Sequence, residues 1–205
     1  MTREQQRKLR ELKSNLSKIL KEKSKKYNLK KRDYMLWFQK GDMFFTCLLY
    51  VGFSMDGKFV CDTIENMKPL WIDDLLWDFL KSPENKKQPL SLRAIGAFTV
   101  HGVDLYRSRD ELINGELSEL EICVEKYIEH FYQTIQSVKP DVFYQNISSS
   151  PYHEELRISL TFIHEKKYKE ALEYLCDKDS GVFHSGDISI HNAIREFCEK
   201  QINSV

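Results

Sequence analysis

The chain of 205 residues is 41% hydrophobic, 12% aromatic and 30% charged, which excludes a disordered, collagen-like or low-complexity protein and allows a sizeable core in one or two domains. Its longest apolar stretch, Met43 to Val51, is far too short to span a bilayer, and the polar, basic residues 1–26 lack the apolar segment of a signal peptide. Five scattered cysteines without a C-x-x-C pair indicate reduced thiols and a cytoplasmic protein.

The net charge of zero conceals a strong asymmetry along the chain. Residues 1–40 hold 14 Lys or Arg against four acidic residues, a balance of +10, so residues 41–205 carry −10. A basic arm on an acidic body is typical of binding to an anionic partner, or of a solvated helix balanced by the chain's own carboxylates. We favour the second interpretation.

The first expected element is a helix from about Glu4 to Lys26. Its aliphatic residues recur at steps of three and four: Leu9, Leu12, Leu16, Ile19 and Leu20. This stripe is narrow and holds no Phe or Trp, which suits a helix on a sheet better than one embedded in a membrane.

The period then changes from 3.6 to 2, which predicts a three-stranded antiparallel meander. The strands are expected at Tyr34–Gln39, Met43–Phe53 and Phe59–Glu65, with turns at Gly41-Asp42 and Asp56-Gly57. The middle strand is apolar on both faces, which indicates a central position.

The next segments predict two helices and a fourth strand. A short helix is expected from Leu70 to Lys81, a strand over Ser91–Val100, and a long helix from Leu117 to Val138. Ser108-x-x-Glu111 has the capping-box pattern of a helix start.

The C-terminal part predicts helices alone. A linker is expected over residues 139–152, followed by a hairpin of two helices, Glu154–Ile163 and Tyr168–Cys176, and a last helix from about Asp187 to Ile202.

The predicted fold class is therefore α+β. We expect an antiparallel sheet of about four strands covered by helices in a domain of residues 1–138, and a C-terminal helical appendage of residues 153–205.

No motif for catalysis or metal binding is found. The eight glycines form neither G-x-G-x-x-G nor a P-loop, and H-E-x-x-H and G-x-S-x-G are absent from the sequence. His101 and Arg93 are the first candidates for an enzyme with a dispersed site, but on one strand they would be about 26 Å apart. We assign no catalytic residue, metal ligand or cofactor.

The most unusual feature is Trp77 in the short helix. It lies off the apolar stripe of that helix and beside Asp73 and Asp74, so the indole needs cover from the chain itself, a partner or a ligand. The leading hypothesis is a non-enzymatic protein-binding module, such as an adaptor or an immunity-like protein. The expected contact residues are Trp71, Asp73, Asp74, Trp77 and Arg93.

The alternative hypothesis is nucleic-acid binding through the basic first helix, which would weaken steeply with salt. The expected phosphate contacts are Lys8, Arg10, Lys18, Lys21, Lys25 and Lys26. Against this alternative, no aromatic side chains accompany the basic run to stack on bases.

The order of elements also carries a resemblance. The basic first helix and aromatic meander, followed by Lys68-Pro69-Leu70-Trp71-x-Asp73-Asp74 and Ser91-Leu92-Arg93-Ala94-x-Gly96-Ala97-Phe98, resemble a group of uncharacterised bacterial proteins that carry a domain of unknown function. The resemblance covers roughly residues 5–138. It implies a bacterial, cytoplasmic α+β protein and implies no activity.

Overall fold

The computed structural model describes residues 2–96, 98–178 and 183–204, which form an α+β protein. The chain divides into two compact units: unit 1 is residues 1–67 and 104–142, and unit 2 is residues 68–103 and 143–205. Residues 68–103 therefore group with the C-terminal helices, whereas the sequence places them in the same domain as the sheet.

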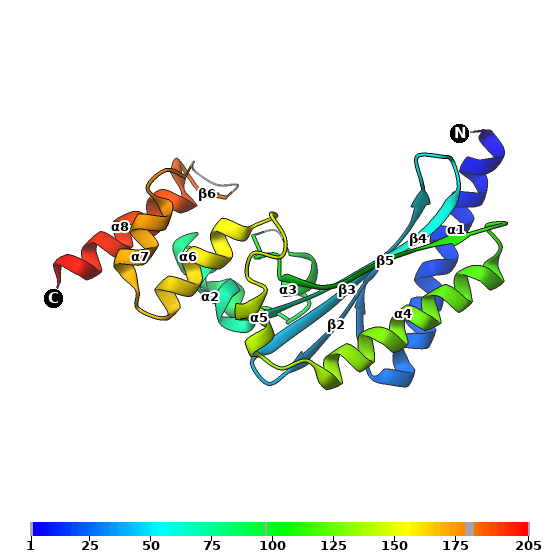
Figure 1. Ribbon diagram of the computed structural model, residues 1–205, viewed down its shortest axis with the longest axis horizontal. Coiled ribbons are helices and arrows are strands. Elements are labelled where there is room, and N and C mark those ends of the chain that lie inside the picture. The colour runs from blue at the N-terminus through cyan, green and yellow to red at the C-terminus, as the bar shows by residue number, and fades with distance from the viewer. Residues whose placement is uncertain (1, 97, 179–182, 205) are drawn as a thin grey trace. The chain divides into compact units, whose positions relative to one another are not determined.

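Unit 1 is built around an antiparallel sheet of five strands in the order β1-β2-β3-β4-β5 (Figure 1). The strands are β1 (Lys30–Arg32), β2 (Met35–Lys40), β3 (Met43–Phe53), β4 (Phe59–Pro69) and β5 (Val103–Leu112). The predicted meander of β2, β3 and β4 is confirmed with β3 at its centre, and β1 and β5 extend the sheet to five strands rather than about four.

The predicted strand over Ser91–Val100 is wrong, although residue 97 lies outside the described part. Leu92–Ile95 form the short helix α3, and the next strand is β5, which contains the Ser108-x-x-Glu111 pattern assigned above to a helix start. β5 is an edge strand, and its charged side chains pair with its neighbour: Arg109 Nε donates to Asp62 at 2.7 Å. An edge strand with charged residues lacks the apolar alternation by which a strand is recognised in a sequence.

Two long helices pack against β3 and against each other on one face of the sheet (Figure 1). They are α1 (Arg3–Lys23) and α4 (Leu117–Ser137). α1 stops before the predicted Lys26 because a 3-10 helix, η1 (Ser24–Tyr27), follows it and ends at Asn28 in the left-handed conformation, with φ of 54°. Side chains buried in this layer include Leu12, Leu16, Leu20, Val124, Tyr127, Phe131, Phe45, Cys47 and Leu49.

Unit 2 is mostly helical. Its main helices are α2 (Leu70–Phe79), α6 (Glu154–His164), α7 (Tyr168–Leu175) and α8 (Ile190–Asn203), with a short 3-10 helix η2 (Pro83–Lys87) and the short pair β6 (His184–Ser185) and β7 (Ile188–Ser189). α6 and α7 form the predicted hairpin and α8 is the predicted last helix, beginning at Ile190.

The segment expected as a linker is ordered by a buried arginine. Residues 139–152 include the short helix α5 (Asp141–Gln145). Arg157 of α6 is 0% exposed and donates to the carbonyl oxygens of Ile147 at 2.8 Å and Tyr152 at 2.6 Å. Because a guanidinium has five donors, one side chain holds several turns of this segment against α6.

Candidate functional site

Most of the residues expected to bind a partner lie in a buried charge cluster of unit 2. Asp73 of α2 is 0% exposed; its carboxylate lies 2.8 Å from Lys68 Nζ and accepts the backbone N–H of Val100 at 2.8 Å. Arg93 of α3 is 7% exposed and donates to the carboxylate of Asp74 at 2.6 Å. These charges satisfy one another and hold α2 against the segment that ends at Val100.

Trp77 belongs to the same buried cluster. Its side chain is 1% exposed, and its Nε1–H donates to the carbonyl oxygen of Phe98 at 2.7 Å. The guanidinium of Arg93 lies over the indole, 4.6 Å from the ring centroid. The indole of Trp77 is stable beside two aspartates because a cation lies over its ring and its N–H has an acceptor. The chain itself therefore covers Trp77, which presents no surface to a partner.

The remaining expected contact residues are more accessible. Trp71 is half-buried, and its ring stacks on His164 of α6 with centroids 4.0 Å apart and planes at 1°. Asp74 is also half-buried, although Arg93 occupies its carboxylate. The five residues do not form a continuous partner surface, because Asp73, Trp77 and Arg93 are buried.

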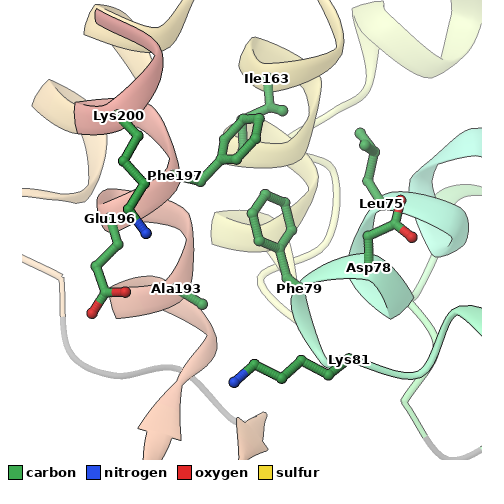
Figure 2. Close-up of a pocket in the computed structure, with 9 residues that line it drawn as sticks. All are labelled: Leu75, Asp78, Phe79, Lys81, Ile163, Ala193, Glu196, Phe197 and Lys200. Carbon is green, nitrogen blue, oxygen red and sulfur yellow. The ribbon is translucent and has the colours of Figure 1, made fainter. Parts of the chain in front are cut away.

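The side of α2 opposite Trp77 forms a groove with α6 and α8 (Figure 2). Its volume of about 450 Å³ is in the range of ligand-binding pockets. The lining residues are Leu75, Asp78, Phe79, Lys81, Ile163, Ala193, Glu196, Phe197 and Lys200. This groove is the best-formed candidate site on unit 2.

The walls of the groove are aromatic and aliphatic. Phe79 of α2 meets Phe197 of α8 edge to face, with centroids 5.4 Å apart and planes at 83°. Figure 2 shows the two rings extending toward each other from opposite walls, with Ile163 beside them. Phe197 is also supported by Tyr168 of α7 at 5.9 Å. Apolar side chains held by such contacts form a preformed surface for a bulky apolar group.

Charged side chains surround this apolar floor. Asp78 is already paired, because Lys86 of η2 donates to its carboxylate at 2.6 Å. Lys81 after α2 and Lys200 on α8 make no ion pair with any residue that the structure describes, and neither does Glu196. Two lysines on opposite walls therefore remain available to an acidic group of a ligand (Figure 2).

The groove residues of α2 cannot be told from its core residues by helical spacing. Leu75 and Phe79 fall on the same apolar stripe as Ile72 and Leu76, yet they are half-buried whereas Ile72 and Leu76 are 0% exposed. α2 is apolar on almost every side, so its hydrophobic pattern cannot distinguish a buried side from a groove. The available signal was this excess of apolar residues on a short helix.

The basic first helix is partly balanced by carboxylates of α4, as the favoured interpretation expects. Lys8 pairs with Glu116 at 2.8 Å, and Lys23 pairs with Glu125 at 3.0 Å. Of the other expected phosphate contacts, Arg10 donates through Nε to a backbone oxygen of its own helix, and Lys26 lies over the ring of Tyr27. Among the residues that the structure describes, the lysines of this set that are exposed and make no ion pair are Lys18, Lys21, Lys25 and Lys26.

A second arrangement with catalytic character lies in unit 1. Glu65 of β4 is 0% exposed and bonds to Nδ1 of His130 at 2.8 Å, and the ring of Tyr106 stacks on this imidazole at 3.8 Å. Burial raises the pKa of the Glu65 carboxyl, opposed by the His130 contact. A carboxylate that orients a half-exposed imidazole is the arrangement of a general base. The Thr134 hydroxyl, however, lies 3.5 Å from the same Nδ1, which Glu65 already contacts. His130 is therefore not placed to deprotonate Thr134 through Nε2.

Metal and membrane sites were also sought. Within residues 2–96, 98–178 and 183–204, no three His, Cys, Asp or Glu side chains are placed to hold a metal ion. None of the helices in the described part of the chain is both long enough and apolar enough to cross a membrane.

Comparison with known proteins adds no homologue. No protein-family model, curated protein or solved structure matches the chain.

Proposed function

We propose that the chain is a protein-binding module whose groove between α2, α6 and α8 receives an amphipathic helix of a partner protein. The observation that carries this proposal is the preformed apolar floor of Phe79, Phe197 and Ile163. Helices that bind in grooves insert bulky apolar side chains from one face, at helical spacing.

The charges around the groove specify the partner further. Lys81 and Lys200 stand on opposite walls, and Asp78 is neutralised by Lys86. An incoming helix with Asp or Glu beside its apolar face would pair with these lysines, whereas a basic helix would meet them at the cost of repulsion. The expected partner segment is therefore acidic and amphipathic.

The composition of the groove favours binding over catalysis. Among the described residues that line it there is no histidine, cysteine, serine or threonine, and its Asp78 carboxylate is held in an ion pair. The buried cluster around Asp73 holds α2 in place and so supports the groove wall that α2 forms. The expected contact residues in this cluster therefore have a structural role and not a contacting one.

The experiment is a selection from a displayed library of helical peptides on the full chain. Enriched peptides should carry bulky apolar residues at i, i+3 or i+4 and i+7, together with Asp or Glu. One enriched peptide is then labelled and its affinity measured by fluorescence anisotropy. Ala193→Phe, which fills the groove, should weaken binding by about 100-fold, since it removes the anchor site. Glu199→Phe adds the same ring on the same helix outside the lining and is the matched control.

A second pair of variants tests the charges. Lys81→Glu with Lys200→Glu should weaken the acidic peptide, whereas Lys87→Glu with Lys169→Glu should not, because these exposed lysines do not line the groove. Peptides that bind Ala193→Phe as well as the native chain would refute the proposal. Binding of a small apolar dye that Ala193→Phe abolishes, without any peptide, would assign the groove to a small molecule instead.

A further inference from the structure

Helix α1 has α4 on one side and strand β1 on another. On the α4 side, Lys23 of α1 pairs with Glu125 at 3.0 Å, and the two helices lie next to each other in Figure 1. On the β1 side, Lys31 Nζ donates to Ser17 Oγ at 3.1 Å. The two sides of α1 therefore have different charged neighbours.

The β1 side of α1 is basic. Ser17 shares this side with the residues four and seven positions away, which include Lys13, Lys21 and Arg10. Strand β1, at the edge of the sheet, adds three consecutive basic residues. Among the described residues, Arg10, Lys21 and Lys30 are exposed and make no ion pair. We define the basic patch as six residues: Arg10, Lys13, Lys21, Lys30, Lys31 and Arg32.

The acidic residues of the same segment lie mostly on the opposite side of α1. Residues 1–40 contain four of them, and Glu4 and Glu11 line a small pocket with Glu116, which precedes α4. Glu22 follows Glu11 by eleven residues, which is about three helical turns, so it falls on the same side. Within residues 2–40, Asp33 directly after β1 is the one acidic residue beside the basic patch. The patch is therefore a strongly positive surface.

Two tyrosine rings form a pocket beside the basic patch. Tyr34 precedes β2 and Tyr50 lies in β3, and their side chains are 37% and 47% exposed. A cavity of about 120 Å³ is lined by Lys13, Leu16, Tyr34, Tyr50 and Val51. Pockets for drug-sized ligands have volumes of about 300 Å³ or more, so this cavity suits a single flat ring.

Lys13 belongs to both the pocket and the basic patch. Its ammonium lies over the Tyr50 ring, 5.0 Å from the ring centroid. The same ring lies across Gly52, where the Cβ of any other residue would clash with it. Proteins bind single-stranded nucleic acid with positive charges along the phosphates and with aromatic rings on which the bases stack. The fold brings Tyr50, which is distant in the sequence, to the basic segment.

We propose that unit 1 binds single-stranded nucleic acid, with the phosphates along the basic patch and one unpaired base in the pocket of Tyr34 and Tyr50. A base within a duplex is already stacked and cannot enter this pocket, whereas an unpaired base presents its flat face. An anionic lipid surface or an acidic peptide would satisfy the charges of the patch but would leave the pocket without a flat ring. The groove residues all belong to unit 2, so each proposal can fail without the other.

The first measurement is the affinity of the full chain for a labelled single-stranded oligonucleotide of random sequence, about twelve nucleotides long, as DNA and as RNA. Fluorescence anisotropy should give a dissociation constant of about 1–100 μM near physiological salt. The logarithm of the association constant should fall with the logarithm of the NaCl concentration with a slope near −4, about 0.7 for each of six released counterions. No binding of either oligonucleotide at about 100 μM protein, or an affinity that does not depend on salt, overturns the proposal.

The second measurement removes charges from the patch. Lys21→Gln with Lys30→Gln should weaken binding by about 10-fold at about 0.15 M NaCl and reduce the steepness of the salt dependence by about 1.4, since two fewer counterions are released. Lys87→Gln with Lys169→Gln gives the same change of net charge at exposed positions of unit 2 and should change neither quantity. An unchanged slope in the patch variant refutes the assignment of the patch.

The third measurement removes the ring. Tyr50→Leu should weaken binding of the single strand by about 10-fold or more, as the loss of one stacked base does, and should leave the slope unchanged because no charge is removed. Tyr50→Phe keeps the ring and should bind as the native chain does. Tyr144→Leu is the matched control, because Tyr144 is 44% exposed and lies in unit 2. Tyr34→Leu gives the same test if Tyr50→Leu does not fold.

The same oligonucleotide annealed to its complement decides whether a base enters the pocket. The native chain and Tyr50→Leu should bind this duplex equally, because its bases are paired. Native-like binding of the single strand by Tyr50→Leu, or an equal loss for single strand and duplex, refutes the pocket. Vesicles of phosphatidylserine and phosphatidylcholine that bind the native chain when no oligonucleotide does would overturn the proposal and assign the patch to a membrane surface. Ala193→Phe should leave oligonucleotide binding unchanged, because residue 193 lies in unit 2.

Discussion

Asp73→Asn is the sharpest test of the buried charge cluster in unit 2. Asparagine keeps the shape of the side chain but removes the counter-ion of Lys68, whose side chain is only 5% exposed and whose Nζ lies 2.8 Å from the carboxylate. Breaking a buried ion pair on one side costs about 3–5 kcal/mol. That is a large share of the stability of a domain, about 5–15 kcal/mol in total.

The double variant Asp73→Asn with Lys68→Met separates the ion pair from the packing. It removes both charges, so the cost should fall to about 1–2 kcal/mol, mainly because the Val100 carbonyl loses the donor that Lys68 supplies at 2.7 Å. The free energy of the double variant should therefore lie closer to that of the native chain than the free energy of the single variant does.

The pH dependence of the single variant has a defined sign. Burial lowers the pKa of Lys68 below its ordinary value of 10.5, and Asp73 opposes this effect. In Asp73→Asn the opposition is lost and the pKa falls further. The unfolded chain then binds more protons than the folded chain, so the stability of the variant should rise with pH toward 10.5.

The assay is urea unfolding followed by tryptophan fluorescence in a Trp37→Phe background. Trp37 lies in unit 1, and the remaining Trp71 and Trp77 both lie in unit 2. The fluorescence change then reports unit 2 alone, which avoids treating two units as one transition. A loss below about 1 kcal/mol for Asp73→Asn, the level of a surface ion pair, would refute the reasoning.

Three further predictions follow from single side chains. Arg157→Met should destabilise unit 2 by about 3 kcal/mol or more and speed proteolysis within residues 146–152, because several backbone oxygens lose a charged donor. Burial, reinforced by positive groups that include Arg157, lowers the pKa of His153 from 6.5 to about 4. The neutral His153 imidazole therefore stabilises the fold fully above pH 6.5, and this stabilisation is lost as the pH falls toward 4. The loss is at most about 1.4 kcal/mol per pH unit and is smaller with solvent screening. In His153→Asn, the free energy of unfolding measured with urea should vary less with pH between 4 and 6.5. A thiol reagent should modify Cys176 rapidly in the folded chain and the other four cysteines only after unfolding, since those four are buried.

Local pattern was sufficient for much of the fold. Three features depend only on neighbouring residues: the aliphatic spacing of the first and the long central helices, the alternation over β2 to β4, and the Asp56-Gly57 turn. The structure has these elements at nearly the predicted bounds. Such features are predictable because helix and strand periods are properties of the chain segment itself.

β5 and α3 were beyond this kind of reasoning. β5 is charged along its length because it occupies a sheet edge, where Arg109 reaches Asp62 across 47 positions of sequence. Asp62 lies beside Arg109 only once the sheet has assembled, so the charged sequence of β5 does not by itself indicate a strand.

The site depended on tertiary structure still more strongly. The sequence singled out α2, but whether Trp77 or Phe79 meets solvent is decided by residues distant in the chain. Arg93 and Phe98 cover Trp77, whereas Phe197 stands across the groove from Phe79. A helix that is apolar on nearly every side has no periodic signal for its exposed face. The sequence by itself determined that α2 must be covered on several sides, and only packing against α3 and α8 decided which side stayed open.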